Sequence, residues 1–263
     1  MSLPTGQISF SDLKVLGGGP SIRLGQYYPD GFGSGVSNIP SRGTEISIGV
    51  FRGKSYSPPY VTNGLLVFFD PGNTSSYPGT GRSLTSLVGS ITASVNGAYG
   101  YSSGNGGFIS LCNINTVDRL QNVSFLKLPT VSSFKTISVW YRIPSISAKP
   151  SYFIDAREGV AEGFILDNSV GAAWTNAVMR VNGGTDLSLD NGNVTSQVFA
   201  TGSWRNIMLS SSNAMTDDVT LFSRYSSNEG LNVSFGVIMM YDRQITNAEN
   251  LTNYNAFKSR YGL

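Results

Sequence analysis

A short run of apolar residues between turn-forming residues is the most distinct feature of the hydrophobic pattern. Residues 64–69, GLLVFF, are followed by Asp70 and by a loop rich in Pro, Gly, Ser and Thr that extends to Gly81. A run of this length between turn signals is typical of a strand buried on both faces rather than of a helix. The residues before this strand indicate a separate small module, and the residues after it indicate one long all-β domain.

Short apolar and alternating segments continue from this strand to the C-terminus. Turn signals recur about every 8–12 residues, which favours a sandwich of many short strands. The segment 99–107 is rich in Tyr, Ser and Gly and is predicted to be a loop. Further strands are predicted at 90–95, 108–112, 123–128, 134–143, 152–154, 163–166, 178–181, 196–200, 204–209, 219–222 and 233–241. In 134–143 the alternation of a strand places Ile137, Val139 and Tyr141 on one face and Thr136, Ser138 and Trp140 on the other.

One helix is predicted at the end of the chain. Thr246 and Glu249 have the spacing of a capping box, in which each side chain satisfies a backbone N–H of the other residue. Leu251, Tyr254 and Phe257 then follow at helical spacing and form an apolar stripe. We expect this stripe to lie against the β-domain.

Composition and charge exclude several function classes. Charged residues make up 13% of the 263 residues and the net charge is +2, with no basic run that would bind nucleic acid. With one cysteine and no histidine, intramolecular disulfides and Cys/His zinc sites are excluded. Cys112 is expected to be a small buried strand residue. No segment is long and apolar enough for a membrane span, and the N-terminus does not resemble a signal peptide, so we expect synthesis in a cytosol.

The first 56 residues contain a weak threefold repeat with apolar residues at i, i+2 and i+5. Copies this short bury too little apolar surface to offset about 1–2 kcal/mol of backbone entropy per residue. The segment is therefore expected to be a docking arm that is ordered by a partner, with a floppy leader as the alternative, and residues 57–263 are expected to be the β-domain. The apolar residues of the arm are Ile8, Phe10, Leu13, Ile22, Leu24, Tyr27, Ile46, Ile48 and Phe51.

The arm also resembles a known type of leader. LPTGQISFSDLKVLGG, followed by ISIGVFRGKS, is similar to the leader on structural proteins of tailed phages and some large DNA viruses. The GKS at 53–55 does not form a phosphate-binding loop, because Ile48 stands where that motif needs glycine. The resemblance implies attachment to a virion.

Segments of the β-domain resemble the laminin-G type of concanavalin A-like jelly roll. They are GLLVFFDPGNTSSYPGTG at 64–81, KTISVWYR at 135–142, GSWRNI at 202–207, and the stretch 240–262, which is similar to a phage-type ending of such domains. The resemblance implies an all-β, concanavalin A-like (LamG-type) sandwich with a short C-terminal helix. Where many LamG domains hold calcium, this chain departs from the pattern, and Asp70, Asp118, Asp155 and Asp167 are scattered. No cofactor is expected, with calcium as the one open alternative.

Catalysis is not expected from this sequence. Glucanases of the same superfamily need two carboxylates about 5–5.5 Å apart for a retaining mechanism, and the sequence offers no such alternating pair. Without histidine, no Ser-His-Asp or Cys-His nucleophile can form. The glutamates are Glu45, Glu158, Glu162, Glu229 and Glu249; Glu158 and Glu162 are interpreted as residues of a solvated loop near Asp155.

Aromatic and amide side chains are the remaining candidates for a binding site. Exposed aromatic rings beside Asn are typical of carbohydrate platforms, and Tyr99, Tyr101, Asn105, Trp174 and Asn176 could form one. The alternative is that Trp174 anchors a loop, while Trp140 and Trp204 pack in the core.

These features are consistent with two functions from different classes. The first is a non-enzymatic virion structural protein, a capsid- or tail-associated decoration or fibre component, that is anchored by its arm to other virion proteins and to copies of itself. The second is an adhesin that binds host surface polysaccharide, and a glucanase comes third. Neither nucleic-acid binding nor membrane insertion is expected.

Overall fold

The computed structural model describes residues 58–112, 123–145, 152–156, 164–167, 171–172, 174, 177–188, 197–224 and 230–263. Residues Asn63–Leu263 form one compact unit. The predicted arm and all of its apolar residues lie outside the described ranges, so the docking arm stays a prediction.

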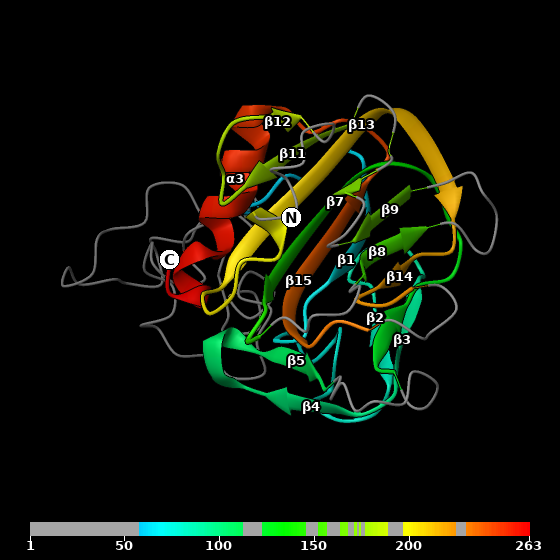
Figure 1. Ribbon diagram of the computed structural model, residues 1–263, viewed down its shortest axis with the longest axis vertical. Helices are drawn as coiled ribbons and strands as arrows, with labels where there is room; N and C mark the ends of the chain where they lie inside the picture. The colour runs from blue at the N-terminus through cyan, green and yellow to red at the C-terminus, as the bar shows by residue number, and fades with distance from the viewer. Residues whose placement is uncertain are drawn as a thin grey trace, which may run out of the picture. The chain divides into compact units, whose positions relative to one another are not determined.

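Two antiparallel sheets form the described part of this unit (Figure 1). In the larger sheet the order is β12 (Leu187–Ser188), β11 (Ala177–Val181), β13 (Arg205–Asp217), β7 (Val131–Arg142), β15 (Val233–Tyr241), β5 (Phe108–Leu111) and β4 (Tyr99–Ser102), and β1 (Leu65–Phe69) also pairs with β15. In the smaller sheet it is β10 (Gly171–Ala172), β9 (Phe164–Asp167), β8 (Tyr152–Ala156), β14 (Thr220–Leu221), β6 (Phe125–Lys127), β3 (Thr92–Asn96) and β2 (Ser83–Thr85). With one short C-terminal helix, this confirms the predicted all-β fold class.

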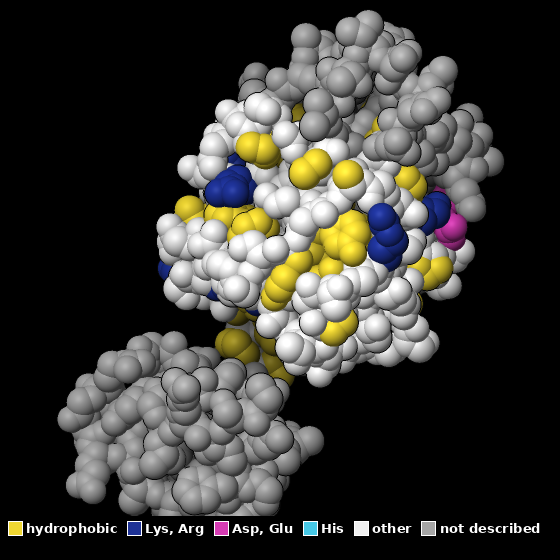
Figure 2. All heavy atoms as spheres, turned by 90° about the horizontal axis from the view of Figure 1, so that it is seen from below, with side chains coloured by type: hydrophobic (Ala, Val, Ile, Leu, Met, Phe, Trp, Pro, Cys, Tyr) yellow, Lys and Arg dark blue, Asp and Glu magenta, His cyan; other side chains and the backbone are white. Residues whose placement is uncertain are grey.

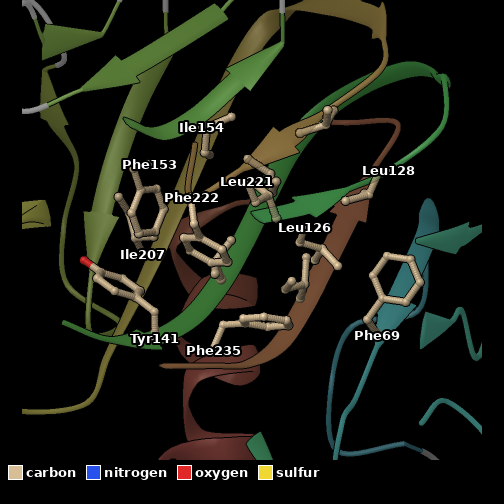
Figure 3. Close-up of a cluster of buried hydrophobic side chains, with 14 of the residues drawn as sticks. Phe69, Leu126, Leu128, Tyr141, Phe153, Ile154, Ile207, Leu221, Phe222 and Phe235 are labelled. Atoms are coloured by element: carbon tan, nitrogen blue, oxygen red, sulfur yellow. The ribbon is translucent and has the colours of Figure 1, made fainter. Parts of the chain in front are cut away.

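The core lies between the two sheets and is rich in aromatic rings (Figure 3). Phe153 on β8 meets Tyr141 on β7 edge to face, with ring centroids 4.6 Å apart. Phe222, directly after β14, packs against Phe153 at 5.4 Å and against Phe235 on β15 at 5.3 Å. Rings from both sheets therefore interdigitate, and such pairs stabilise a core beyond the area that they bury.

The alternation predicted for 134–143 is confirmed, and it defines two faces of the larger sheet. Ile137, Val139 and Tyr141 belong to the core cluster. Trp140, between them, stacks instead on Tyr254 and Tyr261, with centroids at 5.5 and 4.6 Å. We call the face that carries Trp140 the outer face; it looks away from the smaller sheet.

The C-terminal segment covers part of the outer face. It consists of α3 (Asn247–Phe257) and the short helix η5 (Lys258–Tyr261). The phenol of Tyr261 accepts a hydrogen bond of 2.9 Å from the backbone N–H of Val237, where β15 is irregular between Phe235 and Ile238. Burial raises the pKa of Tyr261 to about 12, so this phenol stays neutral. The chain end is thus fixed to a central strand.

The predicted capping box is present, but the predicted apolar stripe is only partly correct. Thr246 and Glu249 cap each other's backbone as expected. Tyr254 and Phe257 face the sheet, whereas Leu251 is 46% exposed and Asn253 is buried in its place. The reason is that the sheet offers a buried phenol: Asn253 donates a hydrogen bond of 3.0 Å to the hydroxyl of Tyr241, and a buried polar group needs such a partner.

The pH dependence of stability should report the ion pair at the start of α3. Hydrogen bonds from Arg243, at 2.9 and 2.6 Å, lower the pKa of Glu249 to about 2. An unfolded glutamate has a pKa of about 4.3, so this pair stabilises the fold above that pH, and the contribution is lost as the pH falls towards about 2.

The variant Glu249→Gln tests this, since glutamine preserves the capping box. Because both side chains are partly exposed, we expect a loss of about 0.5–1 kcal/mol in the free energy of unfolding at pH 7. Urea unfolding at pH 7 and pH 3 measures it. The difference from the parent protein should shrink at pH 3, and a difference that stays constant would contradict the ion-pair account.

Two predicted segments differ from the structure. Residues 99–102 form strand β4 instead of a loop. In 196–200 no strand is present in the described residues: Gln197 and Val198 are helical. The carbonyl oxygen of Val198 accepts a hydrogen bond of 2.7 Å from the buried Tyr141 hydroxyl. This carbonyl therefore binds a phenol of the core instead of a backbone N–H of a neighbouring strand.

Candidate functional site

The turn of the β4–β5 hairpin is locked to the loop after β1 and to the end of the chain. A β-carbon at Gly72 would overlap the carbonyl oxygen of Gly106, so these two turns touch backbone to backbone. Arg260 donates hydrogen bonds to both carboxylate oxygens of Asp70 and, at 3.2 Å, to the carbonyl oxygen of Gly107. We call these contacts the lock; they tie the turn of the hairpin to both segments.

The hairpin carries the two tyrosines that the sequence singled out. Tyr99 pairs with Leu111 and Tyr101 with Ile109. Since Leu111 and Ile109 belong to the core, both tyrosines lie on the inner face, opposite to the outer face defined above. β4 is the edge strand, so the rings are not fully covered: Tyr99 is half-buried and Tyr101 is 37% exposed.

A third tyrosine, which the sequence reasoning missed, supports the other two. Tyr77, in the loop after β1, is buried, and its ring centroid lies 5.3 Å from that of Tyr101. Its hydroxyl donates a hydrogen bond of 2.8 Å to the carbonyl oxygen of Gly81. Burial, together with the nearby phenols of Tyr99 and Tyr101, raises the pKa of Tyr77 to about 12. In the sequence, Tyr77 stands in the segment SYPG at 76–79, which indicated only a turn.

A basic side chain completes this group. The guanidinium of Arg82 lies 5.0 Å from the ring centroid of Tyr99 and donates to the carbonyl oxygens of Val95 and Gly97, at 3.1 and 2.8 Å. We call Tyr77, Tyr99, Tyr101 and Arg82 the tyrosine surface. Asn105, exposed at the tip of the same hairpin, adds an amide. Exposed rings backed by fixed groups can stack on the apolar face of a sugar or on another ring.

Trp174 is not part of this surface. It is 6% exposed and packs edge to face on Phe134, with centroids 5.7 Å apart. It lies three residues before β11. In the sheet order β11 is five strands from β4, or roughly 24 Å at about 4.8 Å per strand. Trp174 therefore fits the alternative, a residue that anchors its loop in the core. Burial removes its apolar ring from water, which stabilises the fold. Asn176 lies outside the described residues.

The other tryptophans are buried, as expected. Trp140 and Trp204 are 1% and 5% exposed, but they lie under the C-terminal segment on the outer face and not between the sheets. Cys112 differs from expectation: it follows the last residue of β5 and is exposed. The strand ends one residue earlier than predicted, so its side chain is not covered.

Several carboxylates are engaged by cations. Asp70 pairs with Arg260, and Glu249 pairs with Arg243. Asp217 and Asp218 are adjacent at the end of β13, where burial raises the pKa of Asp217. Asp218, however, is held by Lys127 at 3.4 Å and by Thr130 at 2.6 Å. Asp155 is completely buried on β8. Glu45, Glu158, Glu162 and Glu229 lie outside the described ranges, so the expectation of no catalysis stays untested.

Metal binding and membrane insertion can be examined only for the part of the chain that the structure describes. There, no three His, Cys, Asp or Glu side chains come together as metal ligands. Among the suggested calcium ligands, Asp70 is occupied by Arg260, and Asp118 is not described. No helix in these ranges has both the length and the apolar character that a membrane span requires.

Comparison with known proteins gives a fold and no family. No protein-family model and no curated protein matches the chain. A sialidase from Trypanosoma rangeli has a similar structure, with a TM-score of 0.50 and 11% identity, over 87% of this chain and 37% of that one. The receptor-binding domain of botulinum neurotoxin type G aligns with a TM-score of 0.44 and 11% identity, over 74% of this chain and 51% of that one. The chain thus spans about a third to a half of these proteins, and the likeness to the sialidase shows the fold alone.

Proposed function

We propose that this chain is a non-enzymatic structural protein of a virion, a decoration or fibre component on a capsid or tail. The arm of residues 1–56 attaches it to other virion proteins, and copies of the chain associate with one another. The protein is made in a host cytoplasm and becomes part of the virion; it neither binds nucleic acid nor inserts into a membrane. The resemblance of the leader and of the LamG-type segments to virion proteins supports this proposal.

One observation carries it: the phage-type ending is fixed to the sandwich by its own side chains. Residues 240–262 are the stretch that resembles that ending most specifically. Within it, Arg243 hydrogen-bonds Glu249 and Asn253 hydrogen-bonds Tyr241, and Arg260 reaches out of it to Asp70. These side chains are engaged in holding the fold and are not presented to a substrate. The stretch that most resembles a virion protein therefore has a structural role in this chain.

The test is whether the protein is a constituent of particles. Virions of the virus that encodes the chain are banded in a density gradient, stripped with high salt, and probed with an antibody against the β-domain. We expect the antigen to band with intact particles and to label their surface in electron micrographs. Antigen found only in the soluble lysate would overturn the proposal.

A second function is favoured by the tyrosine surface: recognition of a host polysaccharide. Tyr101 is exposed on an edge strand, its ring is supported by Tyr77, and the hairpin beneath it is locked by Arg260. A rigid aromatic side chain loses little conformational entropy on binding, which is why such rings are favoured in binding surfaces. We propose that this recognition needs no calcium.

A glycan array with the full chain tests this second function. We expect a sugar hit that survives EDTA and is weakened about tenfold by Tyr101→Ala, since ring contacts contribute about 0.5–1.5 kcal/mol beyond the area buried. Tyr101→Phe is the matched control, because it keeps the ring and should keep most of the affinity. An array without any hit, or equal binding by the alanine variant, would rule out this surface.

A further inference from the structure

Four strands place a row of polar positions side by side on the outer face of the larger sheet. Arg142 on β7 is opposite Ser234 on β15, Ser234 is opposite Ser110 on β5, and Ser110 is opposite Gly100 on β4. Their strand neighbours, such as Tyr141, Phe235 and Ile109, point into the core. Since side chains alternate along a strand, these four residues share the outer face. We call them the Arg142 row.

In the part of the chain that the structure describes, the guanidinium of Arg142 is a half-buried cation without an anionic partner. It lies 5.9 Å from the ring centroid of Phe108 and 5.7 Å from that of Trp204. In the described part of the chain, no hydrogen bond or ion pair satisfies it, and its Nε is buried without an acceptor. The arginines at 180, 243 and 260, by contrast, each pair with a carboxylate, although the Nε of Arg260 is also buried without an acceptor in the described residues.

A second unsatisfied donor lies beside it. Trp204 is 5% exposed, and its indole N–H has no acceptor in the described residues. An unpaired buried donor costs about 1–3 kcal/mol, so a fold retains one where something else satisfies it or where it serves a function. Trp204 also packs on Phe108 at 5.4 Å and on Tyr261 at 4.6 Å. Aromatic rings therefore border the row along one side.

The rest of the row is a flat and polar floor. Ser110 is half-buried and Ser234 is 5% exposed, and their hydroxyls, 2.8 Å apart, hydrogen-bond each other. At Gly100, which is exposed, a β-carbon would meet nothing within 4 Å, so the floor is open at the edge of the sheet. Figure 2 views the molecule from the side on which β4 and β5 lie in Figure 1; among the described residues, Lys and Arg side chains stand there among apolar ones, and acidic side chains appear at one margin.

We propose that the Arg142 row binds the carboxylate of an acidic sugar residue, such as a uronic acid within a polysaccharide. Arginine presents N–H donors in a planar fork that matches a carboxylate, and stacking on rings holds that fork in place. Ser110, which is half-buried, supplies a hydroxyl that can both donate to and accept from a sugar hydroxyl, and the buried Ser234 holds that hydroxyl in place. The rings of Phe108 and Trp204 border the sugar ring, and the open end at Gly100 lets a polymer continue past the sheet edge.

A saccharide fits this row better than an acidic protein segment. A strand of a partner protein would need unpaired backbone groups, which lie along the edge of β4 and not on the face of the sheet. The face offers side-chain hydroxyls, rings and one guanidinium, a combination that suits a ring bearing both hydroxyls and a carboxylate. This site is separate from the tyrosine surface, which lies on the inner face, and does not depend on the virion proposal.

Calorimetric titration of the full chain with polygalacturonate at low salt tests the inference. Fully methyl-esterified galacturonan is the neutral control ligand, and a poly-glutamate peptide is the acidic protein-like control. We expect polygalacturonate to bind and the ester to bind at least about tenfold more weakly, since a charged hydrogen bond contributes about 1.5–3 kcal/mol. Poly-glutamate has the carboxylates but neither the sugar ring nor its hydroxyls, so we expect it to bind more weakly than polygalacturonate.

Variants decide which residues bind. Arg142→Gln should weaken binding by about tenfold or more, while Lys127→Gln, which removes the same charge from the smaller sheet, should change it less than about twofold. The double variant Ser110→Ala/Ser234→Ala removes both hydroxyls together and should weaken binding while Arg142 stays in place. It keeps the test decisive if Arg142→Gln does not fold. Tyr101→Ala should have no effect.

Three results would overturn the inference. They are the absence of binding to polygalacturonate, equal losses for Arg142→Gln and Lys127→Gln, which would mean unspecific charge attraction, and tighter binding of poly-glutamate than of polygalacturonate. None of these results bears on whether the protein is part of a particle.

Discussion

Replacing Gly236 by alanine should lower the free energy of unfolding by about 3 kcal/mol, because a β-carbon there would overlap the phenol of Tyr261. That phenol accepts a hydrogen bond from the N–H of Val237, and its ring stacks on Trp140 and packs at a tilt against Trp204. It cannot move aside without leaving a buried N–H unpaired, which itself costs about 1–3 kcal/mol. Urea unfolding followed by tryptophan fluorescence measures the loss, since both tryptophans touch the displaced ring.

Gly100→Ala is the matched control for this variant. Gly100 also lies in a strand of the larger sheet, but a β-carbon there would meet open space. Alanine at Gly100 should therefore be neutral or slightly stabilising. Similar losses for the two variants would mean that strand glycine itself, and not the contact with Tyr261, sets the stability.

The second large effect is expected at the ion pair between Asp70 and Arg260. Their side chains are only 12% and 19% exposed, and Arg260 also holds Gly107. Removing one partner from a mostly buried pair leaves an uncompensated charge, so Asp70→Asn should cost about 3 kcal/mol. Because the pair locks the hairpin that carries Tyr101, we also expect faster amide hydrogen exchange in β4.

Lys127→Gln provides the comparison. It breaks the ion pair between Lys127 and Asp218, in which the lysine is 29% exposed, and such pairs contribute about 1 kcal/mol or less. Chemical denaturation and hydrogen exchange of both variants distinguish the two cases. A loss for Asp70→Asn no larger than that for Lys127→Gln, with unchanged exchange in β4, would refute the role of the lock.

Much of the fold was predictable because its signals are local. The alternation of 134–143 correctly separated Tyr141 from Trp140, and the run 233–241 matches β15 residue for residue. Thr246 and Glu249 are three residues apart, so their capping box depends on no distant contact. For this reason, the period of the apolar residues and the residues that cap a helix can both be recognised in a single sequence.

The errors arose where a distant contact outweighs the local signal. The stretch 99–102 contains the Gly and Ser of a loop, yet pairing with β5 makes it a strand. Leu251 looked like a core residue, but the phenol of Tyr241 needed an amide, and Asn253 supplies it. Local propensity loses to tertiary context in both places.

The candidate sites show the same limit more strongly. Tyr99 and Tyr101 are close in sequence and were identified as a pair, whereas Tyr77 joins them only through the lock between two turns. The Arg142 row cannot be read from the sequence, because Arg142, Ser234 and Ser110 become neighbours through strand register alone. Trp174 was a candidate for sugar binding because it is aromatic and close to Asn176 in the sequence. Its ring is buried against Phe134 and is therefore not presented to a sugar.

The most direct measurement for the account as a whole is the copy number of the protein per particle. Virions are produced from a host that supplies either the full chain or a chain without residues 1–56, and the protein is quantified by mass spectrometry. We expect a fixed number of copies per particle with the full chain and a loss of nearly all of them without the arm, while the arm-less protein stays folded in the lysate. Equal incorporation of the two forms, or absence of both from purified particles, would contradict the account.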